Sequence, residues 1–262
     1  MQANKFNEFS MKQLLIVGHT FPEPSTTAAG SRMMQLIALF TEYEYEITFA
    51  TTALPTDRSV NPKNGNISIK NILLNDSSFD GFIKSLKPAI VIFDRFITEE
   101  QFGWRVAEHC PNALRILDTE DLHFLRKARE EAVKLRMDVS EPNIFSEVAK
   151  REIASIIRSD LSLIISEFEM ELLVDKFKIP VDLLYYLPFL LEENSVTALN
   201  FEERKNFVVI GNLLHAPNVD AVLQLKRLWP IIKELLPHAQ LHIYGAYAPQ
   251  QILQLHNEKE GF

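Results

Sequence analysis

The sequence predicts a doubly wound α/β protein, with one complete domain followed by part of a second. Short apolar segments alternate with longer amphipathic ones from Leu14 onward. Many of the short segments are apolar on both faces, which is typical of parallel strands in a sheet covered by helices on both sides. The alternation lapses at residues 191–206 and then restarts for only two more strand candidates.

The first domain is expected to span residues 11–190, after a polar tail at residues 1–10. Met11 is the expected functional start, because the segment before it is polar and loosely patterned. The predicted strands lie at residues 13–18, 46–52, 67–74, 89–94, 114–118, 161–166 and 181–187. Helices are predicted at 31–43, 98–110, 147–159 and 167–177, where apolar residues recur three and four positions apart.

Residues 191–206 are polar, acidic at both ends and without a sustained period, so they predict a linker. The remaining segment, 207–262, offers two strand candidates, NFVVIG and QLHIYG, and two helical ones. Two strands and two helices cannot enclose a core of their own. We therefore expect the second domain to be truncated.

Composition narrows the class of protein. A hydrophobic content of 47% with 24% charged residues is that of a folded globular protein. The net charge of -8 disfavours a nucleic-acid partner. The single cysteine, Cys110, excludes an intrachain disulfide and a cysteine zinc site. No apolar segment approaches the roughly 20 residues of a membrane span, and the polar start is unlike a signal peptide, so a cytoplasmic location is expected.

The segment LRKAREEAVKLR, residues 125–136, mixes basic and acidic residues. It predicts a solvated helix face with ion pairs three and four residues apart. Peripheral contact of this helix with a membrane stays open as an alternative.

A long loop follows the first strand and leads into a helix expected to begin at about Ser31. Ligands of open parallel sheets bind beyond the carboxyl ends of the strands, where helix N-termini present free amides. Gly30 and Ser31 could bring backbone amides to a phosphate, or could equally be a turn glycine and a helix N-cap. Neither a G-x-G-x-x-G nor a G-x-x-x-x-G-K-[ST] motif is present.

The stretch LDTEDLH places Asp118, Asp121 and His123 at the end of a predicted strand. Asp118 at an N-cap with Asp121 three residues on is similar to a capping box, and acids in a first helical turn are each favoured by roughly 0.3–1 kcal/mol. Capping does not explain His123. A histidine flanked by carboxylates at a sheet edge can act as a base or hold a sugar hydroxyl. We expect both: acids that cap a helix, and a helix that presents His123 to a cleft, the cap being the firmer prediction.

The second unit carries a recognisable pattern. The segment FVVIGNLLHAPNVDAVLQLKRLWPIIKELLPHAQLHIYG resembles the start of the donor domain in family 4 glycosyltransferases of the GT-B type, which have two Rossmann-like domains. In one branch of that family a strand ends in glycine and is followed by H-x-P-N-x-D-A, then W-P-x-I and a second glycine. The matching residues are Gly211, His215, Pro217, Asn218, Asp220, Ala221, Trp229, Pro230, Pro237 and Gly245.

The first domain resembles the same family. Gly30 and Arg32 follow its first strand, and LDTEDLHFLRKARE stands where relatives carry a D-x-x-D-x-H-x-x-R segment. The resemblance covers most of residues 11–257. It implies transfer of a sugar from a nucleotide-diphosphate donor to a carbohydrate or lipid-linked acceptor, with retention and without a required metal or other cofactor.

The resemblance also implies residue roles. Gly30 and Ser31 would approach the donor phosphates through their amides. His123, with Asp118 and Asp121, would deprotonate or orient the acceptor hydroxyl. The edge of the donor site would be formed by Gly211, Asn212 and His215.

Two departures from the family pattern keep alternatives open. The stretch NLLHAPNVD lacks the arginine and lysine that many relatives carry, and the E-x7-E motif would lie beyond Phe262. We therefore expect no turnover by this chain as it stands. The alternatives are a GT-B sugar-nucleotide epimerase and a noncatalytic binding or scaffold protein with a degenerate fold. For His215 and Asn218, the alternative is that Pro217 starts a helix and Asn218 helps cap it.

Overall fold

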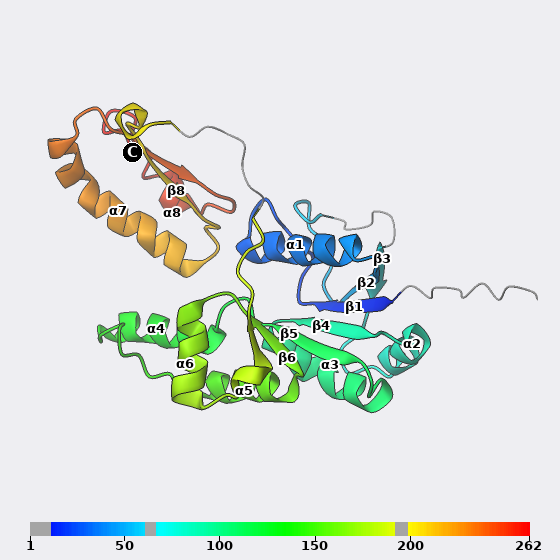
Figure 1. Cartoon of the computed structure of the whole chain (residues 1–262). Coiled ribbons are helices and arrows are strands. Elements are labelled where there is room, and N and C mark those ends of the chain that lie inside the picture. The colour runs from blue at the N-terminus through cyan, green and yellow to red at the C-terminus, as the bar shows by residue number, and fades with distance from the viewer. Residues whose placement is uncertain (1–11, 61–66, 192–198) are drawn as a thin grey trace, which may run out of the picture. The chain divides into compact units, whose positions relative to one another are not determined.

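The computed structural model describes residues 12–60, 67–191 and 199–262 (Figure 1). The predicted tail at residues 1–10 and Met11 lie outside the described residues. The chain divides into two compact units. One consists of residues 1–24 and 29–190, and the other of residues 25–28 and 191–262.

The first unit is built on a seven-stranded sheet whose neighbouring strands all run parallel. The order is β3-β2-β1-β4-β5-β6-β7. Strands β2 and β3 are therefore added on one side of β1 and strands β4 to β7 on the other, which places a topological switch point between β1 and β4. Such a switch point opens a crevice at the carboxyl ends of the strands. The strands are β1 Gln13–Gly18, β2 Glu46–Thr51, β3 Ile67–Asn71, β4 Ile90–Asp94, β5 Leu114–Asp118, β6 Leu161–Ile164 and β7 Leu184–Tyr186.

Helices cover both faces of this sheet (Figure 1). Alternate residues of β1 belong to two hydrophobic cores, one on each face of the sheet. Leu14 and Ile16 pack with α1, whereas Leu15 and Val17 pack with the helices of the opposite face. This explains why the strands read as apolar runs. The helices are α1 Ala28–Glu42, α2 Ser78–Leu86, α3 Arg95–His109, α4 His123–Leu135, α5 Glu147–Arg158 and α6 Glu167–Phe177.

The predicted strands of the first unit are confirmed, with shorter ends. The segment predicted as a strand at 181–187 begins as a 3-10 turn, Val181–Leu183, and becomes extended only in β7. Pro180 precedes this turn and has no N–H to donate to a strand partner. The helix expected at about Ser31 begins earlier, at Ala28.

The second unit has a two-stranded parallel sheet of β8 Phe207–Ile210 and β9 Leu241–Tyr244, with α7 Ala216–Leu235 and α8 Gln250–Leu253. Trp229 is the centre of a small core and donates its indole N–H to the Glu260 carbonyl at 2.7 Å. Trp229 therefore packs inside this unit, and the expectation that two strands and two helices cannot enclose a core of their own is wrong for residues 207–262. Most of β8 is nevertheless exposed, with Ile210 at 79%. The two-stranded sheet of β8 and β9 is therefore only partly covered by the helices of this unit.

The predicted linker is described only in part, because residues 192–198 lie outside the described residues. Within it, Phe201–Glu203 forms a 3-10 turn, η2. Asn200 and Glu203 form a capping box at this turn, so some of the polar residues of the predicted linker stabilise local structure.

Gly30 lies in the first turn of α1, against the loop that precedes the helix. A Cβ at Gly30 would come within 2.5 Å of the backbone N and C atoms of Glu23. Ser31 fastens the same loop, because its hydroxyl donates to the Pro24 carbonyl at 2.9 Å. The close approach of loop and helix therefore requires glycine at this position.

We predict that Gly30→Ala destabilises the chain by about 1–3 kcal/mol, because the added methyl group forces the Glu23 backbone away from α1. Gly81→Ala is the matched control, since a Cβ at Gly81 in α2 meets nothing within 4 Å. The control is expected to be neutral or to stabilise by about 0.5–1 kcal/mol. Urea unfolding followed by circular dichroism measures both. A Gly30→Ala variant as stable as Gly81→Ala would contradict the close packing.

Candidate functional site

The candidate site lies at the carboxyl ends of β1, β4 and β5, beside the switch point. Asp94 ends β4 and Asp118 ends β5, and the two are direct partners in the strand register. His19, which follows β1, donates its backbone N–H to Asp94 Oδ2 at 2.8 Å. Burial, together with nearby Arg95, lowers the pKa of His19. The fold thus gathers polar groups from three strands at one edge.

A buried ion pair organises this edge. Arg32 of α1 and Asp118 of β5 are 1% and 0% exposed, and Arg32 Nε lies 2.9 and 3.1 Å from the two carboxylate oxygens. Arg32 Nη1 donates to the Leu187 carbonyl at 2.8 Å. Burial raises the pKa of Asp118 to about 6, and Arg32 opposes that rise. Asp118 is therefore mainly a carboxylate at pH 7, and the pair ties α1 to β5 and to the segment after β7.

The prediction that Asp118 and Asp121 cap the next helix is wrong. Helix α4 begins at His123, and its N-cap residue, Leu122, makes no side-chain cap. Its amides are capped from elsewhere: Glu152 of α5 accepts from His123 N at 3.1 Å and from Phe124 N at 2.9 Å. Glu169 of α6 accepts from Leu122 N at 3.1 Å. A local capping pattern cannot reveal partners that lie 28 to 47 residues away.

His123 is a largely buried imidazole with its side chain 12% exposed. Its ring meets the edge of Phe96 at a centroid distance of 5.5 Å, and its Nε2 lies 3.4 Å from Asp121 Oδ1. Burial lowers the pKa of His123 to about 4, although Asp121 opposes this shift. The ring is therefore neutral at pH 7, a state that can accept a proton or a hydrogen bond.

Glu120 lies in the same LDTEDLH stretch, in which the sequence analysis assigned roles only to Asp118, Asp121 and His123. It is 7% exposed, has a left-handed backbone with φ 63°, and its Oε1 has no hydrogen-bond partner among the described residues. Burial, with added repulsion from Asp118 and Asp94, raises the pKa of Glu120 to about 8. It is therefore a neutral carboxylic acid at pH 7. Backbone strain of this kind gathers at functional sites, but the sequence alone carried no signal of it.

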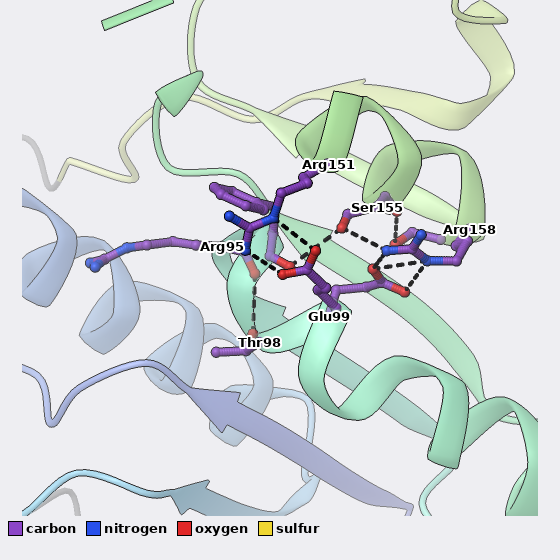
Figure 2. A network of polar contacts seen from close by, with 9 residues as sticks. Arg95, Thr98, Glu99, Arg151, Ser155 and Arg158 are labelled. Carbon is purple, nitrogen blue, oxygen red and sulfur yellow. Dashed lines mark hydrogen bonds and ion pairs between the residues drawn. The ribbon is translucent and has the colours of Figure 1, made fainter. Parts of the chain in front are cut away.

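The charges of the site are balanced in pairs. Three carboxylates each have one arginine: Asp118 with Arg32 at 2.9 Å, Asp94 with Arg95 at 3.3 Å, and Asp121 with Arg126 at 2.9 Å. Figure 2 shows the Arg95 side chain extending away from the ion pair between Glu99 and Arg158. Two neutral groups accompany these pairs, the Glu120 acid and the His123 imidazole. Such an edge is suited to the hydroxyls of a sugar more than to the charge of a diphosphate.

The structure separates the predicted site residues into groups. Asp118, Asp121 and His123 are gathered at the edge described above. Asp118 is enclosed by Arg32, so it does not face solvent. Gly30 and Ser31 sit two residues and one residue before Arg32, where loop packing accounts for both.

Gly211, Asn212 and His215 belong to the second unit. A Cβ at Gly211 would come within 2.8 Å of Asn218 Nδ2, which donates to the Asn212 carbonyl at 2.8 Å. The prediction that Asn218 caps α7 is wrong, because the helix starts at Ala216 with His215 as its N-cap residue. The Asn218 side chain instead fixes the loop that follows Gly211.

A pocket of about 780 Å³ also lies in the second unit, beside β9. Leu213, Leu241, Tyr244, Ile252 and Phe262 are among its lining residues. None of the predicted site residues lines it. Its walls come from β9, α8 and the C-terminal residues, and they include the polar side chains of His242, His256 and Glu258 beside the apolar ones.

Two further searches returned nothing for residues 12–60, 67–191 and 199–262. No three His, Cys, Asp or Glu side chains among them are grouped so as to hold a metal ion. No helix in this part of the chain is both long enough and apolar enough to cross a membrane.

Comparison with known proteins identifies the fold. No protein-family model and no curated protein sequence matches the chain. Among solved structures, the lipopolysaccharide outer core galactosyltransferase WaaB matches 93% of this chain with a TM-score of 0.56 and 13% identity. The sucrose-phosphate synthase from Thermosynechococcus elongatus matches 92% with a TM-score of 0.62 and 12% identity. A structure from Listeria monocytogenes described as a UDP-N-acetylglucosamine 2-epimerase matches 94% with a TM-score of 0.52 and 12% identity.

The chain has a GT-B-type fold. It spans 63%, 64% and 65% of the length of those three chains. The predicted fold class, one complete Rossmann-like domain and part of a second, is thereby confirmed. Identities of 12–13% establish the fold alone, so the activity has to be argued from the residues of the site.

We predict that Glu120→Gln makes stability less dependent on pH. The folded chain holds the Glu120 proton up to about pH 8, whereas an unfolded chain releases it near the ordinary value of 4.5. The contribution of Glu120 is therefore fully present below pH 4.5 and is lost as the pH rises toward 8. Glutamine cannot ionise. The free energy of unfolding of the variant, relative to that of the wild type, should therefore increase by on the order of 1 kcal/mol per pH unit across this window.

Urea unfolding between pH 5 and pH 8 measures this difference. Glu131→Gln, an exposed position on α4, is the control. A constant difference between the Glu120→Gln variant and the wild type would contradict the buried neutral acid.

Proposed function

We propose that this chain is the acceptor-side domain, with part of the donor-side domain, of a glycosyltransferase. The reaction is transfer of a sugar from a nucleotide-diphosphate donor to a hydroxyl of a carbohydrate or lipid-linked acceptor, with retention. The observation that carries the proposal is the neutral His123 imidazole, held between Asp121 and Phe96 at the carboxyl edge of a GT-B-type sheet.

In the proposed reaction, His123 accepts the proton, or a hydrogen bond, of the attacking hydroxyl. The acceptor O–H bond breaks and the oxygen bonds to the anomeric carbon. The nucleoside diphosphate leaves with the bonding electron pair from the same face of the sugar, which gives retention. The Asp121 carboxylate near Nε2 favours a proton on that nitrogen, which leaves Nδ1 as the acceptor. Asp121 would also stabilise the imidazolium once it forms.

Asp118 takes a different part in the proposal. Because it is fully buried on Arg32, it acts as a positioning residue and does not touch substrate. Gly30, Ser31, Gly211, Asn212 and His215 stay as proposed donor-side contacts.

A lipid-linked acceptor and peripheral membrane contact belong to the same proposal. On α4, Val133 and Leu135 are 56% and 62% exposed and flank the cationic Lys134. Apolar and basic groups on one helix suit a lipid surface. A cytoplasmic location is proposed with them.

The proposal is tested by binding. Acceptor saccharides, mono- and oligosaccharides in a panel, are titrated into the chain while the His Cε1–H resonances are followed by NMR. We expect the His123 resonance to shift and that of exposed His238 to stay. His123→Ala should weaken saccharide binding about 5–10-fold, the effect of one hydrogen bond, and His238→Ala should not. A panel that leaves the His123 resonance unmoved at saturating concentration would contradict the proposal.

A sugar-nucleotide epimerase is the second candidate, supported by the match to the structure described as an epimerase. The two differ in the need for an acceptor. Interconversion of a sugar nucleotide in the absence of any saccharide acceptor would favour the epimerase.

A further inference from the structure

The N-terminus of α4 is closed by acids from two other helices. Three consecutive amides, those of Leu122, His123 and Phe124, donate to Glu169 and Glu152. Free amides at a helix N-terminus normally bind an anion from solvent. Here their partner is the Glu152 carboxyl group, which is 0% exposed and accepts from two amides with its two oxygens. Burial raises the pKa of Glu152 to about 8, although the two amide hydrogen bonds oppose that rise. The first turn of α4 is therefore held from inside the protein.

Helix α5, which carries Glu152, is itself anchored to α3. Arg158 forms an ion pair with Glu99 at 2.6 Å and also donates to Ser155, as Figure 2 shows. Arg151, adjacent to Glu152, pairs with Glu100. Glu152 thus lies between two residues of α5 that form ion pairs with α3, and these ion pairs fix the position of the helix that carries it.

The same helix also holds the residue against which the His123 ring packs. The Ser155 hydroxyl donates to the Phe96 carbonyl at 3.3 Å, and the Arg151 guanidinium lies 5.3 Å from the centre of the Phe96 ring. Phe96 in turn meets the edge of the His123 ring. Helix α5 therefore contacts the surroundings of His123 in two ways: Glu152 binds the His123 backbone amide, and Ser155 and Arg151 contact Phe96.

We propose that Glu152 is the positioning residue of His123, and that it keeps the imidazole buried against Phe96 by fixing the first turn of α4. Glu169 supports it at the adjacent amide. This inference rests on the proposed role of His123. A glutamine at position 152 has the same shape but only one acceptor oxygen, and its amide N–H would face a backbone N–H. The first turn of α4 should then loosen and admit water to the His123 ring.

The test is an NMR titration of the His Cε1–H resonances in the full 262-residue chain. In Glu152→Gln the pKa of His123 is expected to rise from about 4 toward its ordinary value of 6.5, by about one unit or more. Glu169→Gln, which loses the bond to Leu122 alone, should give a smaller rise. Glu147→Gln is the matched control, because Glu147 lies on the same helix with its side chain 84% exposed. A His123 pKa in Glu152→Gln equal to that in Glu147→Gln would overturn the proposal.

A measurement on the unmodified chain keeps the proposal testable if Glu152→Gln does not fold. Amides in the first turn of a helix ordinarily exchange fast, because they have no intrahelical acceptor. We expect those of Leu122, His123 and Phe124 to exchange at least about 10-fold more slowly than the Ser78 amide at the start of α2, whose hydrogen bond to Asp76 is exposed to water. Equal rates would overturn the proposal. Both readouts are independent of substrate, so failure of the glycosyltransferase proposal would leave them intact, and their own failure would leave that proposal standing.

Discussion

The ion pair between Arg32 and Asp118 is the interaction on which the carboxyl edge of the sheet depends. Both charges are withdrawn from water, which is favourable only when each finds close partners. Asp118 has two contacts with Arg32, and Arg32 also reaches the backbone after β7. The pair joins three segments that are far apart in the sequence. Because Asp118 is bound to Arg32, it does not cap α4. The first-turn amides of α4 donate instead to Glu152 of α5 and Glu169 of α6. The close packing at Gly30 follows from the same need, because it sets the turn of α1 that carries Arg32.

Pairing of charges leaves the site with neutral groups for chemistry. Each arginine of the cluster has a carboxylate, and burial leaves Glu120 protonated and His123 unprotonated at pH 7. Buried neutral donors and acceptors discriminate well between different arrangements of hydroxyl groups, because leaving a buried polar group without a partner is costly. Stabilising a leaving diphosphate needs positive charge, and this edge has none to spare. The proposed glycosyltransferase function therefore assigns acceptor binding, and not diphosphate binding, to the first unit.

Much of the fold follows from the sequence, and less of the site does. The strands were predictable because many of them are apolar on both faces, a pattern that can be read from the local residues alone. The position of His123 was predictable because it follows a strand end. The capping assignment failed because Asp118 has a stronger partner in Arg32, 86 residues away. Glu120 could not be singled out, since its burial and its left-handed backbone arise from packing. The burial that lowers the pKa of His123 likewise arises from tertiary packing, including the contact with Phe96, which no sequence pattern connects to it.

A double-mutant cycle between Arg32 and Asp118 tests the central claim most directly. The free energies of unfolding of Arg32→Met, Asp118→Asn and the double variant are measured against the wild type by urea denaturation. Each single change leaves a buried charge without its partner and should cost about 3–5 kcal/mol. The account predicts that the double variant costs at least about 2 kcal/mol less than the sum of the two. Additive losses, within about 0.5 kcal/mol, would show that the two side chains do not act as a pair and would contradict the account.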